Sequence, residues 1–198
     1  MHIQSFKGLT LTELLIATGM IGVVMLGMVS VDYATRKSQI TSSRSTHLAM
    51  RLGAMMIHIT RNCSLAIGDN ANSGIRILDT GPVDSRYLCV RQDLAGSPDN
   101  YGDDTWMCYT KRSNGNIYWC TPGTWIACPA VAANNLGAAQ TLTYTYVPDP
   151  NPAVLDNYCE ITITSLYDNT QPFHTVDNPS YTLTSRIQPI GQTNTYVP

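Results

Sequence analysis

The feature that most constrains this chain is an apolar run near its beginning, which carries no charged residue from Leu14 to Val31. A helix of roughly 20 mostly apolar residues is long enough to cross a bilayer. One carboxylate, Glu13, stands immediately before the run. A charge at the edge of a membrane segment is costly, and such residues usually have a functional partner. The run therefore predicts a membrane-spanning helix and raises the question of what Glu13 pairs with.

The residues before the run do not have the order of a secretory leader, in which a small-residue cleavage site follows the apolar stretch. Here Lys7 and Gly8 both precede it. The segment Lys-Gly-Leu-Thr-Leu-Thr-Glu-Leu-Leu-Ile, residues 7 to 16, resembles the class III signal of type IV prepilins and type II secretion pseudopilins. The resemblance extends to about residue 31. It implies that a prepilin peptidase cuts between Gly8 and Leu9 and methylates the new amino group of Leu9.

The same resemblance gives Glu13 a partner, the free amino terminus of a neighbouring subunit. In a low-dielectric site two opposite charges offset part of each other's desolvation penalty, whereas an unpaired charge stays costly. Such a pair would set the axial register between subunits. From the residues alone, an ordinary single-span anchor with a stray interfacial Glu13 is the alternative, and Lys7 and Gly8 would then be coincidental.

Two positions depart from the family pattern. Leu9 stands where the family most often has Phe, which is a mild difference. Ser30 stands where many major pilins carry a helix-kinking Pro, and this departure favours a minor subunit over a major one.

Charge and cysteine usage predict where the chain resides. Lys7 lies on the amino-terminal side of the span and no acidic residue precedes Glu13, which fits a cytoplasmic amino terminus. All six cysteines follow the span, and an even number on the outer side indicates disulfides in an oxidising compartment. We expect a single-pass inner-membrane protein with a periplasmic carboxy-terminal domain, which later enters an extracellular filament.

The helix is expected to run from about Thr10 to about Ile67. Beyond the membrane it carries one apolar stripe at helical spacing. The stripe comprises Ile40, Leu48, Leu52, Met55, Met56, Ile59 and Cys63. This gives four segments: a cleaved prepilin leader at 1–8, a transmembrane and assembly helix at 9–31, its amphipathic continuation at 32–67, and a β-rich pilin domain at 68–198.

From about Gly74 the chain changes to short alternating or β-branched runs separated by turn residues, which predicts an antiparallel sheet. The runs are 75–78, 86–91, 105–111, 116–121, 141–147, 159–166 and 181–190. The expected fold class is α+β, with the amphipathic half of the helix packed on the sheet. Short patches at 48–63 and 181–187 resemble W-type minor pilins and J-type minor pseudopilins.

One hairpin predicts a disulfide. The loop Arg112-Ser113-Asn114-Gly115-Asn116 suits a type I turn closed by a left-handed glycine. In that register Cys108 lies opposite Cys120, and we predict a bond between them. A two-residue Asn-Gly loop would instead leave Cys120 to bond Cys128. The remaining cysteines, Cys63, Cys89 and Cys159, are further disulfide candidates.

The sequence gives weaker signals for a metal site and for nucleic-acid binding. Asp99, Asp103 and Asp104 lie in one polar loop, and oxygen ligands of this kind can hold Ca²⁺. Their spacing matches no EF-hand, so a solvated acidic loop is the preferred interpretation and no cofactor is expected. The chain carries a net charge of −2 and 13% charged residues, without the basic stripe that nucleic-acid binding requires.

No nucleophile motif, phosphate loop or paired metal ligands occur in the sequence, which therefore predicts a non-enzymatic protein. The resemblance implies that this protein is a filament subunit. The resemblance implies a minor pilin of a type IV pilus that acts in filament assembly or priming. Its implied partners are other pilin or pseudopilin subunits, the prepilin peptidase, the inner-membrane assembly platform and membrane lipid. The alternatives are a minor pseudopilin of a type II secretion or competence system and, from another class, a single-span membrane-anchored binding or sensor domain.

Overall fold

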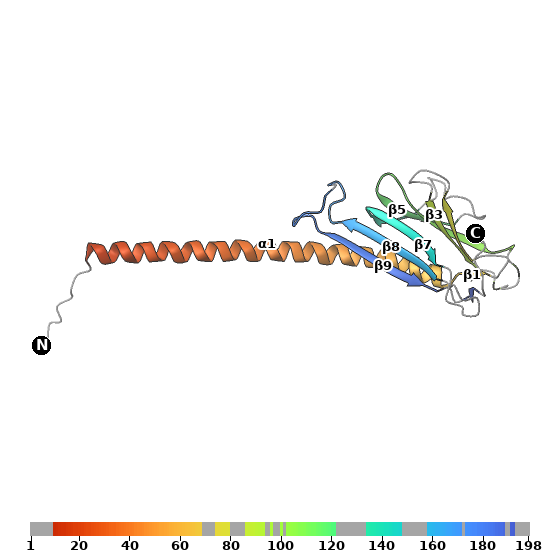
Figure 1. Ribbon diagram of the computed structural model, residues 1–198, viewed down its shortest axis with the longest axis horizontal. Coiled ribbons are helices and arrows are strands. Elements are labelled where there is room, and N and C mark those ends of the chain that lie inside the picture. The colour runs from red at the N-terminus through yellow and green to blue at the C-terminus, as the bar shows by residue number, and fades with distance from the viewer. Residues whose placement is uncertain are drawn as a thin grey trace. The chain divides into compact units, whose positions relative to one another are not determined.

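The computed structural model describes residues 10–68, 74–79, 86–93, 96, 100, 102–121, 134–147, 158–171, 173–188 and 191–192. The chain divides into two units, Met1–Ser43 and Arg44–Pro198. One helix and ten strands are present in the described part of the chain (Figure 1). They are α1 Leu11–Ser64, β1 Ile67–Gly68, β2 Ile75–Asp79, β3 Arg86–Gln92, β4 Thr105–Lys111, β5 Asn116–Cys120, β6 Asn134–Ala138, β7 Thr141–Val147, β8 Tyr158–Leu166, β9 Ser180–Ile187 and β10 Gly191–Gln192.

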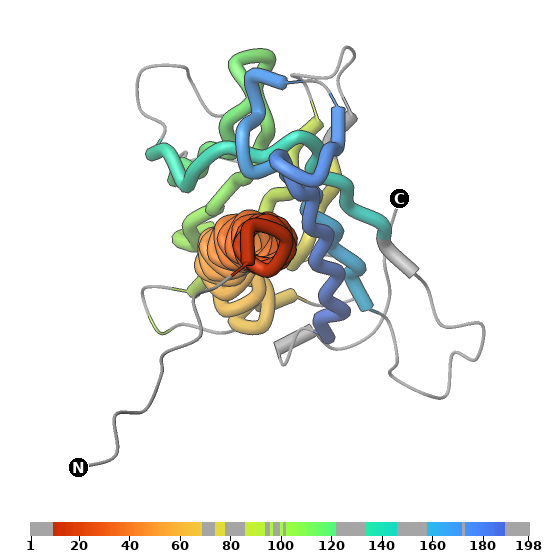
Figure 2. Tube along the Cα trace, turned by 90° about the vertical axis from the view of Figure 1, so that its left-hand side faces the viewer, coloured from red at the N-terminus to blue at the C-terminus, as the bar shows by residue number. Residues whose placement is uncertain are grey.

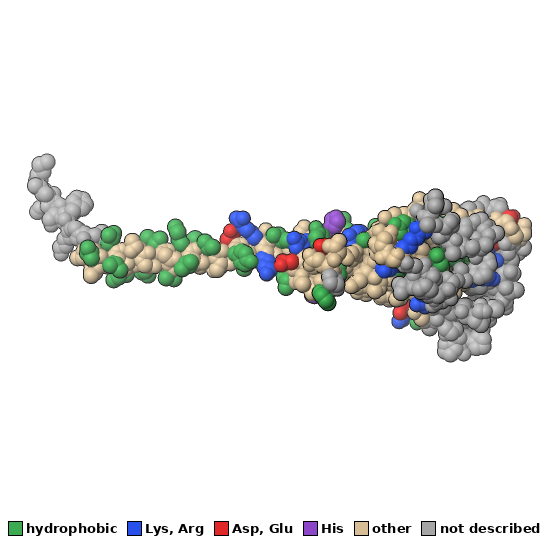
Figure 3. All heavy atoms as spheres, turned by 90° about the horizontal axis from the view of Figure 1, so that it is seen from above, with side chains coloured by type: hydrophobic (Ala, Val, Ile, Leu, Met, Phe, Trp, Pro, Cys, Tyr) green, Lys and Arg blue, Asp and Glu red, His purple; other side chains and the backbone are tan. Residues whose placement is uncertain are grey.

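In the first unit, α1 is apolar from Leu14 to Val31 and carries polar and charged residues after it. Its large apolar side chains between Leu11 and Val31 are all exposed, and Figure 3 shows hydrophobic side chains in green along the amino-terminal part of the helix. The first charges after the run form a pair one helical turn apart, with Arg36 Nε 2.9 Å from Asp32 Oδ2. The helix continues without interruption at Ser30, whose hydroxyl donates to the Gly27 carbonyl at 2.8 Å. By length and composition this helix is able to cross a membrane.

In the second unit, two antiparallel sheets form in place of the single sheet expected from the sequence. One has the order β2-β3-β4-β5-β6 and the other β7-β8-β9, while β1 and β10 form a short parallel pair. Figure 2, a view along α1, shows the green strands of the first sheet and the blue strands of the second on different sides of the helix. The Tyr144 hydroxyl on β7 donates to the Tyr109 carbonyl on β4 at 3.2 Å and links the two sheets.

The buried stripe of α1 completes the core of this unit. Leu48, Leu52, Met55, Met56, Ile59 and Cys63 are all buried, as the helical spacing predicts, whereas Ile40 is exposed. They pack in one cluster with inward-facing residues of both sheets, among them Leu88 on β3 and Ile161 on β8. Gly137 on β6 is required at its place, because its φ is +136° and a Cβ there would lie 3.3 Å from Met55 Sδ. The fold is therefore α+β, with a long amino-terminal helix packed on antiparallel sheets.

Candidate functional site

The amino-terminal turn of α1 is the candidate site, because it holds the carboxylate that the sequence singles out. The Thr10 backbone N–H and the Thr10 hydroxyl both donate to Glu13 Oε2, at 2.9 and 2.8 Å. In return, the Glu13 backbone N–H lies 3.4 Å from the Thr10 hydroxyl. This reciprocal arrangement is a capping box, in which a Thr and a Glu three residues later satisfy orphan groups of the first helical turn. Glu13 therefore has a partner within its own chain.

Among the described residues, only one of the two carboxylate oxygens of Glu13 is used as an acceptor. Both contacts from Thr10 end on Oε2, and Oε1 accepts none of the described hydrogen bonds. An ionised carboxylate offers about four lone-pair positions, so one oxygen can cap the helix while the other accepts from a second donor. Capping and an intersubunit ion pair are thus chemically compatible.

The capping role of Thr10 was missed from the sequence. The signal was present as Thr10-Leu11-Thr12-Glu13, a Thr-x-x-Glu directly before an apolar run. The predicted cleavage site between Gly8 and Leu9 lies outside the described residues and stays a prediction.

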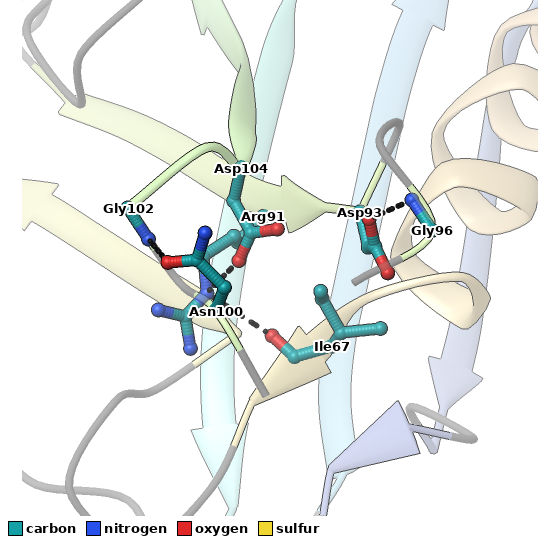
Figure 4. Close-up of polar contacts among 7 residues, drawn as sticks. All are labelled: Ile67, Arg91, Asp93, Gly96, Asn100, Gly102 and Asp104. Atoms are coloured by element: carbon teal, nitrogen blue, oxygen red, sulfur yellow. Dashed lines mark hydrogen bonds and ion pairs between the residues drawn. The ribbon is translucent and has the colours of Figure 1, made fainter. Parts of the chain in front are cut away.

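In the acidic loop between β3 and β4, the carboxylate of Asp104 is buried. Asp104 and Arg91 are both buried, and Arg91 Nε lies 3.6 Å from Asp104 Oδ2 and 3.3 Å from the Ile67 carbonyl (Figure 4). Burial raises the pKa of Asp104, and Asp93 and Asp103 raise it further, whereas Arg91 opposes this. Neither oxygen of Asp104 accepts a hydrogen bond from the described residues.

Two other side-chain oxygens of this loop accept hydrogen bonds from its own backbone. Asp93 Oδ1 accepts from the Gly96 N–H at 2.5 Å, and Asn100 Oδ1 accepts from the Gly102 N–H at 3.2 Å (Figure 4). Asp99, one of the three Ca²⁺ candidates, lies outside the described residues. Among the residues that the structure describes, no three of His, Cys, Asp or Glu could together hold a metal ion. The geometry around Asp104 is that of a buried ion pair with Arg91.

The predicted bond between Cys108 and Cys120 is wrong, although the register behind it is right. Gly115 has a φ of +77°, its N–H donates to the Arg112 carbonyl, and Cys108 lies opposite Cys120. Cys108 is bonded instead to Cys89, which lies opposite it on the other neighbouring strand, with an S–S distance of 2.04 Å. Cys89, Cys108 and Cys120 thus lie side by side across β3, β4 and β5. The hairpin sequence alone does not determine whether Cys108 bonds Cys89 or Cys120.

Cys120 is also disulfide-bonded, and the alternative that joins it to Cys128 falls on a residue outside the described part of the chain. Cys89, Cys108 and Cys120 are buried together with Trp106 in a small cluster of their own. Trp106 therefore packs on the disulfide-bonded cysteines of the sheet.

The comparisons with known proteins give no match. No protein-family model matches this chain, and neither a curated protein nor a solved structure is found to be similar to it. The structure shows an α+β domain with a Cys89–Cys108 disulfide. It also shows one apolar amino-terminal helix of the kind that anchors single-pass membrane proteins.

Proposed function

We propose that this chain is a non-enzymatic structural subunit of a type IV pilus, a minor pilin that is cleaved after Gly8, held in the inner membrane by α1 and then incorporated into the filament. The observation that carries the proposal is the first turn of α1. A single carboxylate stands at the start of an exposed apolar helix and is positioned by Thr10, and the described residues use only one of its oxygens. The Gly8 and Leu9 context of the resemblance supports the same conclusion.

In this proposal Oε2 of Glu13 caps its own helix and Oε1 accepts from the methylated amino group of Leu9 in a neighbouring subunit. The capping contacts fix the carboxylate before assembly, so less side-chain entropy is lost when the ion pair forms. Bilayer or filament surroundings exclude water, and a misaligned neighbour would leave both charges unpaired. The pair therefore selects one axial register.

A minor role is proposed on the strength of Ser30. Many major pilins have a helix-kinking Pro there, whereas here the Ser30 hydroxyl is bonded within an uninterrupted helix. A minor pseudopilin of a secretion or competence system is the nearest alternative. Shearing surface filaments from the cells separates the two, because a minor pilin is retained on sheared pili and a subunit of a short periplasmic complex is not.

The decisive experiment is co-expression with a prepilin peptidase, followed by mass analysis of the amino terminus. We expect a mature chain that begins at methylated Leu9. A Gly8→Val variant serves as the matched control and should keep the full-length mass. A wild-type chain that is uncleaved, or that begins elsewhere, would refute the pilin proposal and favour the membrane-anchored binding domain.

The role of the Glu13 charge is tested with a matched pair of variants. Glu13→Gln keeps an acceptor for Thr10, since Gln also closes a capping box, but it removes the charge. Thr10→Ala removes the hydroxyl and keeps the charge. Both should insert and be cleaved normally. We expect Glu13→Gln to lower incorporation into filaments by about tenfold or more, a loss on the order of 1.4 kcal/mol, and Thr10→Ala to lower it far less.

Glu13→Ala removes both functions of the side chain and should reduce incorporation at least as much as Glu13→Gln. If Thr10→Ala and Glu13→Gln reduce incorporation equally, the carboxylate acts through capping and the intersubunit pair is not needed. Immunoblotting of sheared filaments against the membrane fraction measures all three variants.

A further inference from the structure

Two buried thiols remain after the disulfides of the described residues are assigned. Cys63 lies in the last turn of α1 and Cys159 near the start of β8, and both are unbonded and fully buried. They belong to the same core cluster although they are far apart in the sequence. Within the second unit, β8 begins at the end of the domain where α1 stops (Figure 1).

Each cysteine faces the core for a reason that its element dictates. Cys63 follows Ile59 by one helical turn and continues the buried stripe of α1. Cys159 and Ile161 are two residues apart on β8, so both side chains lie on its inward face. The two thiols also lie in each other's electrostatic field: burial first, and then Cys159, raise the pKa of Cys63. Tyr144 is buried in the same core cluster as both cysteines.

We propose that Cys63 and Cys159 form a further disulfide in the exported, mature protein and join the last turn of α1 covalently to β8. The proposal rests on the proposed function, since it requires the second unit to fold in an oxidising compartment. In that compartment an unpaired thiol is a hazard during folding, because its thiolate attacks disulfides such as Cys89–Cys108 and reshuffles them. Pairing the two remaining thiols removes this side reaction.

The chemistry needs a protein disulfide oxidant of that compartment as co-reactant. The thiolate of one cysteine attacks the oxidant's disulfide and forms a mixed disulfide, and the other cysteine then attacks the substrate sulfur of that bond. One S–S bond forms between Cys63 and Cys159, two S–H bonds are lost, and the oxidant leaves as a dithiol that carries the two electrons. The bond must form while the chain folds, because thiols buried in apolar surroundings react poorly.

The bond has a mechanical consequence for a filament subunit. α1 otherwise meets the sheets through packing and hydrogen bonds, which local unfolding can break. A covalent link at its last turn would keep α1 attached to the β-domain when the helix is pulled out of the membrane.

Peptide mapping of the full-length chain tests the proposal directly. The protein is exported, extracted from membranes in detergent, denatured without reductant in the presence of N-ethylmaleimide, digested and analysed by mass spectrometry. We expect a peptide pair that links Cys63 to Cys159 and no label on either residue. In Cys159→Ser the label on Cys63 should rise from absent to complete, whereas Cys63→Ser/Cys159→Ser should add no label elsewhere.

Label on both Cys63 and Cys159 in the wild-type protein overturns the proposal, as does a bond from either residue to another cysteine. The Cys89–Cys108 bond in the same sample separates two kinds of failure. If Cys89–Cys108 is present, export stands and only the further disulfide is refuted. If it is absent as well, the outward location in the proposed function fails together with the inference.

Discussion

The two halves of α1 have the same backbone and opposite surroundings. In the first unit, the large apolar side chains from Leu11 to Val31 are 55% to 79% exposed, whereas Leu52, Ile59 and Cys63 in the second unit are 0% exposed. Helix propensity does not cause the difference, because Leu and Ile occur in both halves. The second half is apolar on one stripe that the sheets of its own chain cover, and the first half is apolar on every side. An all-round apolar helix needs a lipid or protein environment, and the described residues of this chain leave this half exposed.

The largest difference between the two halves is expected from a pair of leucine substitutions. Leu52→Ala removes buried side-chain volume from the core and should lower the free energy of unfolding of the β-domain by about 2–5 kcal/mol. Leu15→Ala changes a side chain that is 67% exposed and should leave that free energy unchanged. Denaturant unfolding of the detergent-solubilised protein, followed by tryptophan fluorescence, measures both. Equal effects would mean that the two halves of the helix are not energetically distinct.

The contrast between the halves could be predicted from the sequence, since it follows from periodicity. Thr10 to Ile67 was the expected helix, and α1 runs from Leu11 to Ser64. The spacing of its second half predicted the buried stripe, and only Ile40 proved exposed. The seven expected strands all form within a few residues of their predicted ends. The spacing of apolar residues and the β-branched runs therefore identified the helix and the strands that bury one face.

The parts that could not be predicted lack a local signal. β6 has the sequence Asn-Asn-Leu-Gly-Ala, without a single β-branched or aromatic residue. It forms a strand because it pairs with β5 and packs against Met55 at Gly137. The division into two sheets depends on which strand β7 pairs with, and tertiary contacts rather than local sequence decide this. Cys89 joined Cys108 because β3 lies on the other side of β4, and the connection between those strands is too long to fix a register from sequence. The inward turn of Asp104 toward Arg91 had no sequence signal either.

A polar contact at the end of α1 sharpens the comparison further. Asn62 donates to the Tyr109 hydroxyl on β4 at 2.8 Å and accepts from the Gln92 amide on β3 at 2.9 Å. Asn62→Ala would remove the acceptor of the Gln92 amide and one of the partners of the Tyr109 hydroxyl, which keeps its contacts with His58 and Met107. We therefore expect a loss of about 1–3 kcal/mol in the free energy of unfolding. Thr60→Ala is the matched control, because the described hydrogen bond of Thr60 stays within the helix and ends on the Ile57 carbonyl. A loss no larger than that of the control would show that packing alone holds this end of α1.

The smallest effect is expected from His58, where the second half of the helix meets the sheet through a titratable group. Its Nδ1 lies 3.2 Å from the Tyr109 hydroxyl and its ring centroid 5.2 Å from that of Trp119. Burial, and then the charge of Arg61, lower the pKa of His58 below its ordinary value of 6.5. The unfolded chain therefore binds this proton more tightly than the folded chain.

The sign of the pH dependence follows from that difference. The contribution of His58 to stability is fully present above pH 6.5, declines as the pH falls through that value, and levels off below the lowered pKa of the folded state. His58→Gln should flatten this part of the profile, and Arg61→Gln should flatten it in part by removing the second cause. Unfolding midpoints between about pH 8 and about pH 5 measure the slope. A wild-type profile as flat as that of His58→Gln would show that the histidine is solvated and that it does not distinguish the second half of α1 from the first.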